Sequence, residues 1–173
     1  MKPARPILAL ACLVGLAAPA VAQTCLQPSE RVALEVRSLQ SRLMVGAIAC
    51  QQQDAYNAFV RRHQADLGSA YRAAEGHFRR TTGAQGQRRW NQVDTDLAGA
   101  QSQEHTRLGS LYCRDTTAFF QQTANLNGSA DLARFAVERN ILQPYQAPIC
   151  TAATPARASR PAARPASRPA RRG

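Results

Sequence analysis

The spacing of apolar residues constrains the fold of this chain more than any other feature of its sequence. From about residue 32 to residue 126, apolar side chains recur every three or four positions, and no stretch alternates between apolar and polar residues as a half-buried strand does. The first apolar stripe consists of Val32, Val36, Leu39, Leu43, Ala47 and Cys50. The pattern predicts an all-α fold, a bundle of four to five helices.

Capping residues divide this region into the expected helices. Ser29 and Asp54 are the expected N-caps of the first and second helices, and Gly83 is the expected left-handed cap that ends the second. The next apolar stripe is too long for one helix of a globular protein, so we expect a break within residues 102–109. Ser129 is the expected cap of a short last helix.

The first 22 residues have the features of a secretory signal peptide. Lys2 and Arg5 precede a run of 16 apolar or small residues, which ends in Ala20-Val21-Ala22. The alternative is a membrane anchor, but a spanning helix needs about 20 residues. We therefore expect cleavage after Ala22, export to the periplasm or secretion, and no transmembrane segment in the mature chain.

Four cysteines remain after that cleavage: Cys25, Cys50, Cys113 and Cys150. An even number in an exported chain predicts two disulfides, for which three connectivities are possible. If consecutive helices run up and down, Cys50 and Cys113 lie at the same end, which favours Cys50–Cys113 and Cys25–Cys150. Metal binding or redox chemistry is the alternative, but the chain has no Cys-x-x-Cys motif.

Residues 151–173 differ from the rest of the chain in composition. They include 8 Ala, 6 Arg and 4 Pro, and no acidic or large apolar residue. Such a segment cannot bury enough apolar surface to offset the entropy lost on ordering, so we expect a disordered tail. Its arginines are Arg157, Arg160, Arg164, Arg168, Arg171 and Arg172.

Most of the net positive charge lies in that tail. The chain carries a net charge of +11, of which Lys2 and Arg5 contribute two and residues 151–173 contribute six, so that residues 23–150 keep three. We therefore expect three parts: a signal peptide at 1–22, a helical bundle at 23–150 and a disordered tail at 151–173.

No catalytic or metal-binding motif is present. The chain has no His-Glu-x-x-His, no Cys-x-x-Cys-His and no Gly-x-Ser-x-Gly sequence, so we expect no cofactor and no metal. His63 lies on the apolar stripe of the second helix, and His77 lies beside it. Such histidines are usually hydrogen-bonded core residues; the alternative is an interior site for a metal or for catalysis.

Three arginine doublets lie within the helical region: Arg61-Arg62, Arg79-Arg80 and Arg88-Arg89. The second and third flank the turn at Gly83, so one end of the bundle is expected to be basic. This end is either an anion-binding rim that cooperates with the tail or an ordinary solvated surface.

Residues 29–126 resemble small exported helical proteins of proteobacteria whose function is unassigned. The resemblance is carried by Ser41-Arg42-Leu43-Met44-Val45 before Cys50, Tyr56-Asn57-Ala58-Phe59-Val60, Phe78-Arg79-Arg80 and Gly83. It implies a periplasmic or secreted helical domain and no catalytic residue.

These observations favour an exported, non-enzymatic helical protein that associates through its basic tail with an anionic component of the cell envelope. A phospholipid, lipopolysaccharide or a cell-wall polymer would fit, because arginine binds phosphates and carboxylates bidentately. Nucleic acid is a less expected partner, because it is not the usual polyanion of an exported protein. The alternative is a metal-binding or enzymatic bundle that uses His63 or His77. The sequence carries no prediction of an oligomeric state.

Overall fold

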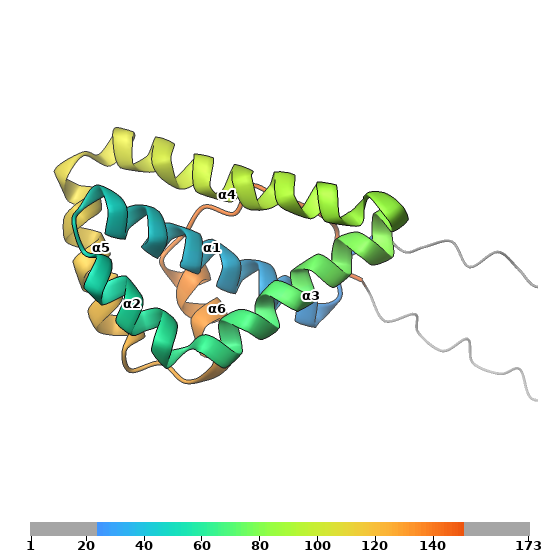
Figure 1. Ribbon diagram of the computed structural model, residues 1–173, viewed down its shortest axis with the longest axis horizontal. Helices are drawn as coiled ribbons and strands as arrows, with labels where there is room; N and C mark the ends of the chain where they lie inside the picture. The colour runs from blue at the N-terminus through green and yellow to red at the C-terminus, as the bar shows by residue number, and fades with distance from the viewer. Residues whose placement is uncertain (1–23, 151–173) are drawn as a thin grey trace, which may run out of the picture.

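Helix α1 (Pro28–Ala49) is the axis around which the other helices pack in the computed structural model, which describes residues 24–150 (Figure 1). The others are α2 (Gln53–Arg62), α3 (Gln64–Thr82), the 3₁₀ helix η1 (Gly83–Gln85), α4 (Gly86–Leu108), α5 (Ser110–Thr123) and α6 (Gly128–Glu138). The predicted all-α, disulfide-linked bundle is confirmed. The expected signal peptide at 1–22 and the expected tail at 151–173 lie outside the described residues.

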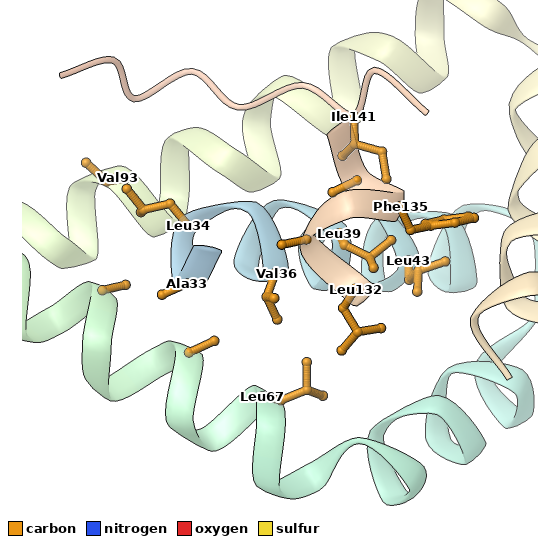
Figure 2. Close-up of a cluster of buried hydrophobic side chains, with 14 of the residues drawn as sticks. Ala33, Leu34, Val36, Leu39, Leu43, Leu67, Val93, Leu132, Phe135 and Ile141 are labelled. Atoms are coloured by element: carbon orange, nitrogen blue, oxygen red, sulfur yellow. The ribbon is translucent and has the colours of Figure 1, made fainter. Parts of the chain in front are cut away.

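The core lies between α1, α3 and α6 and extends to α4 (Figure 2). Helix α1 contributes Leu34, Val36, Leu39 and Leu43, each at most 1% exposed. Because neighbours cover more than one of its faces, α1 also buries Ser38, Ser41 and Arg42. Its buried surface is therefore wider than the single stripe that the sequence predicts.

Three expected N-caps are wrong in detail. Helix α1 is preceded by Gln27 rather than capped by Ser29, because Pro28, with its restricted φ, occupies the first turn. There the backbone N–H of Gln27 donates to Glu30 Oε2 over 2.8 Å. Asp54 lies within the first turn of α2, after the cap position Gln52.

The third wrong cap is at α6, whose cap position is Asn127. The Ser129 hydroxyl is engaged elsewhere, because it donates to Asp66 Oδ1 of α3 over 2.9 Å. It therefore joins two helices instead of closing the end of one.

The expected second helix is divided at His63 into α2 and α3, so that six α-helical segments replace the five that the stripes indicate. His63 is 2% exposed, and its Nε2 lies 3.1 Å from the carbonyl oxygen of Thr123 near the end of α5. This contact attaches the corner between α2 and α3 to α5.

Two glycines end helices with the same backbone conformation. Gly83 after α3 has φ 58° and ψ −126°, and Gly109 after α4 has φ 57° and ψ −129°. Such positive φ angles are readily available only to glycine. Gly83 therefore has a positive φ, but its ψ is outside the left-handed helical region that the expected cap requires. The expected break within residues 102–109 is at Gly109.

The two disulfides join Cys25 to Cys150 and Cys50 to Cys113, which is the connectivity expected from the helix order. Their Cα atoms are 4.9 Å and 5.4 Å apart. Beside the first disulfide, Leu26 N donates to Pro148 O, and Cys150 N donates to Leu26 O, both over 2.8 Å. The coil after α6 is thereby attached to the segment that precedes α1.

No helix among residues 24–150 is both long enough and apolar enough to cross a membrane.

Candidate functional site

The corner between α3 and α4 carries three exposed arginines, Arg79, Arg88 and Arg89, which we call the cationic end. Within residues 24–150, no carboxylate lies within 4.0 Å of these guanidinium groups. The corner is tight at Gly86, where a Cβ atom would lie 2.6 Å from Arg79 Cα. The close approach of the two backbones therefore depends on glycine and brings the second and third doublets together.

The first doublet lies elsewhere. Arg61 and Arg62 are in the last turn of α2, and the 19 residues of α3 separate them from the cationic end. At 1.5 Å per residue this is roughly 28 Å. Two of the three doublets therefore share one end of the bundle.

The Cys25–Cys150 disulfide is at the same end as the cationic end. Arg80 at the end of α3 donates from its NH2 group to the carbonyl oxygen of Cys25 over 2.9 Å. Cys150 is bonded to Cys25 through the disulfide and to Leu26 through its backbone N–H. Cys150, the last described residue, therefore lies beside the cationic end; the six predicted anion-binding arginines are outside the described residues.

A polar cluster of Glu30, His77, Arg80 and Tyr145 lies next to the cationic end. Glu30 accepts two hydrogen bonds from Arg80, over 3.1 Å from Nε and over 2.6 Å from NH2. His77 Nδ1 lies 3.0 Å from Glu30 Oε2, and His77 Nε2 lies 2.9 Å from the hydroxyl of Tyr145. Because an ionised carboxylate only accepts, His77 Nδ1–H donates to Glu30, and Tyr145 donates to Nε2.

Burial sets the electrostatics of the cluster. It lowers the pKa of His77, although hydrogen bonding to Glu30 opposes the shift, so His77 favours the neutral form. Burial alone would raise the pKa of Glu30, but hydrogen bonds from Arg80, Gln27 and His77 outweigh it and lower that pKa. Burial also raises the pKa of Tyr145. The cluster therefore contains one compensated ion pair and two neutral rings.

Both expected interior histidines are hydrogen-bonded core residues in this structure. Each ring nitrogen of His77 has a partner, and His63 is bonded to the carbonyl oxygen of Thr123. Among residues 24–150, no three His, Cys, Asp or Glu side chains group closely enough to hold a metal ion. The geometry of both rings therefore suits the attachment of one segment to another.

Sequence reasoning missed Glu30 and Tyr145 as members of the cluster. The three-residue spacing from Gln27 to Glu30 is typical of a capping box and could have identified the carboxylate. Tyr145 has no comparable signal, because it lies in the irregular segment after α6 and meets His77 only through the fold.

Comparisons of the chain with family models, with curated proteins and with solved structures gave no match. The resemblance to small exported helical proteins therefore stays a prediction. The two disulfides are compatible with a periplasmic or extracellular location.

Proposed function

We propose that this chain is an exported, non-enzymatic helical protein that associates with an anionic component of the cell envelope. Residues 151–173 and the cationic end would act together as one anion-binding region. The observation that supports this proposal is the position of Cys150, which the disulfide to Cys25 and the neighbouring hydrogen bonds hold at the end that carries Arg79, Arg88 and Arg89.

The charges are sufficient for reversible attachment. Six arginines in residues 151–173 and three at the cationic end provide nine guanidinium groups. Each contributes at most about 1 kcal/mol close to an anionic membrane, and salt reduces this contribution. Such binding depends on many weak contacts, so it requires no pocket and no fixed geometry.

Co-sedimentation with vesicles tests the proposal. Vesicles that contain anionic phosphatidylglycerol are compared with vesicles of zwitterionic phosphatidylcholine, using the full exported chain and a chain that ends at Cys150. We expect the full chain to bind only the anionic vesicles, and its binding to weaken strongly between about 50 and about 200 mM salt, because the screening length shortens. The truncated chain is expected to lose most of the binding.

Two matched variants test the contribution of the bundle. Replacing Arg88 and Arg89 together by Gln should weaken binding by the full chain, whereas the same replacement of Arg61 and Arg62, which lie away from Cys150, should have a smaller effect. Equal binding by the full and the truncated chains would rule out the tail as the attachment element. Absence of binding by the full chain would contradict the proposal as a whole.

A further inference from the structure

Arg42 of α1 is a buried cation without an anionic partner. The residue is 4% exposed, and no carboxylate within residues 24–150 lies within 4.0 Å of its guanidinium group. Burial lowers its pKa. A buried charge is costly unless it is paired, so the absence of a partner calls for an explanation.

The groups in direct contact with this guanidinium are neutral; the carboxylates of Asp115 and Glu104 act on it only from beyond 4.0 Å. NH1 donates to Thr116 Oγ1 over 2.7 Å, and NH2 donates to the carbonyl oxygen of Tyr112 over 3.2 Å. The ring of Tyr112 lies beneath it, with its centroid 3.3 Å from Cζ. A guanidinium has five N–H groups, so these two bonds leave donors for a further acceptor.

Arg42 lines a cavity of about 400 Å³ between α1, α4, α5 and the coil after α6. That volume is within the range of small-molecule sites. Charged and amide side chains form much of its wall, among them Arg42, Gln101, Glu104, Arg107, Asp115 and Arg139. The cavity therefore offers space next to the unpaired cation.

Gln101 is a second unsatisfied group in the same wall. It is completely buried, and its Nε2 donates to the carbonyl oxygen of Leu142 over 2.9 Å. This bond fixes the orientation of the amide and leaves Oε1 as a buried acceptor with no hydrogen-bond partner. Buried acceptors without a partner are rare in native proteins, so an N–H donor is expected here.

The other charged residues of the cavity wall indicate which charges a bound ligand would carry. Glu104 and Arg107 neutralise each other, with Oε1 and NH2 2.5 Å apart. Asp115 has only a long contact with Arg114, 3.8 Å between Oδ1 and Nε. Arg139, which is exposed, donates to Gln122 Oε1 and also has no carboxylate within 4.0 Å. The cavity therefore combines two cations without a contacting carboxylate, of which only Arg42 is buried, with one weakly compensated carboxylate, Asp115.

We propose that this cavity binds a free amino acid, with the carboxylate of the ligand on Arg42 and its ammonium group towards Asp115. A zwitterion compensates both charges, whereas a phosphate or a dicarboxylate would bring a second negative charge close to Asp115 and Glu104. The site is separate from the tail and the cationic end, so the proposed envelope association can fail without affecting it.

Calorimetric titration of the full exported chain tests the charge pattern with three matched probes. L-glutamine carries both groups, glutaramate lacks the ammonium group, and L-glutaminamide lacks the carboxylate. We expect L-glutamine to bind about tenfold or more tightly than either analogue, because each analogue loses one charge-assisted hydrogen bond. Inorganic phosphate should bind more weakly than L-glutamine.

Two substitutions assign the contacts. Arg42→Met should abolish measurable binding, and Arg42→Lys should retain part of it. Asp115→Asn should weaken the binding of L-glutamine but not of glutaramate, which has no ammonium group to lose. Asp131→Asn on α6 is the control, because Asp131 pairs with Arg134 and does not line the cavity.

Asp115→Asn keeps the test decisive if Arg42→Met does not fold, because Asp115 is partly exposed. Equal affinity for L-glutamine and glutaramate, or tighter binding of phosphate, would contradict the proposal that the ligand is a zwitterion. No heat from any probe at concentrations up to about 10 mM would overturn the site itself.

Discussion

Glu30 and Arg42 are both on α1 and at most 7% exposed, but the rest of the fold compensates only one of them. The carboxylate of Glu30 accepts hydrogen bonds from Arg80, His77 and the backbone of Gln27. The guanidinium of Arg42 is in direct contact only with a hydroxyl, a carbonyl oxygen and aromatic rings. The charge of Glu30 is therefore compensated within the protein, whereas the guanidinium of Arg42 can still bind an anion.

The backbone shows a similar difference between the two regions. Near the Glu30 cluster, the α3–α4 corner at Gly86 packs backbone against backbone, with the atoms of Arg79 facing it. Near Arg42, Gly46 faces the side chain of Thr116 instead. Thr116 is completely buried and its hydroxyl is bonded to Arg42 and to Tyr112 O, so both glycines lie at close contacts, one with backbone and one with a side chain.

Breaking the compensated cluster should have the largest effect. Glu30→Gln removes the carboxylate charge that Arg80 and His77 contact. We expect it to lower the free energy of unfolding by about 3 kcal/mol, because a largely buried ion pair loses its anion. Urea denaturation measures the change. Glu138→Gln, at an exposed position of α6, is the control; an equal loss in both variants would show that Glu30 has no special role.

Alanine substitutions at the glycines should have the next largest effect on the free energy of unfolding. Gly86→Ala should lower the free energy of unfolding by about 2 kcal/mol, because the new Cβ would lie 2.6 Å from Arg79 Cα and force the corner apart. Gly46→Ala should also lower it, because the new Cβ would lie 2.6 Å from Cγ2 of the buried Thr116. Gly99→Ala, where a Cβ meets nothing within 4 Å, should instead stabilise α4. Thermal unfolding of the three variants gives the order, and a neutral Gly86→Ala would contradict the packing argument.

Protonation should weaken the cluster by a smaller amount. The pKa of His77 is lowered from its ordinary value of 6.5, so the unfolded chain takes up a proton first, and this contribution to stability is lost as the pH falls below 6.5. Glu30, with a pKa lowered from 4.5, adds a further loss below 4.5. Burial raises the pKa of Glu35, which stabilises the fold as the pH falls towards 4.5 and so opposes the His77 contribution above 4.5. Comparison with a variant at His77 separates the two contributions.

The measurement is the urea midpoint at a pH of about 7.5 and of about 5.5. The midpoint should fall with pH in the unmodified protein, and the fall should be smaller in His77→Gln. An unchanged or rising midpoint would show that His77 is not held in its neutral form.

Replacing the uncompensated charge should have the smallest effect on stability. Arg42→Met should change the free energy of unfolding by less than about 1 kcal/mol, because the loss of its two hydrogen bonds is offset by removal of a buried charge that no carboxylate contacts. Thr116 Oγ1 keeps its bond to Tyr112 O, 2.7 Å long, so the substitution leaves no new buried group without a partner. Denaturation in the absence of added amino acids measures the change. A loss as large as that of Glu30→Gln would show that Arg42 is a structural residue.

Helical periodicity and the even number of cysteines were enough to predict the class of the fold and its disulfides, because both depend on local spacing and on the order of the helices. The break at Gly109 and the turn at Gly83 follow from glycine, which alone adopts their positive φ angles readily. The histidines on the apolar stripe were predicted as core residues for the same local reason.

The partners of the buried charges could not be predicted, because they depend on contacts between residues far apart in the chain. His77 is bonded to Tyr145, which is 68 residues away, and Arg42 to Thr116, which is 74 residues away. Periodicity identifies the apolar side of a helix. It does not indicate which polar side chains are buried when neighbours cover a helix on several sides, as they cover α1. The sequence by itself determined that this chain forms a disulfide-linked helical bundle; only the tertiary structure decided that Glu30 is compensated and that Arg42 is not.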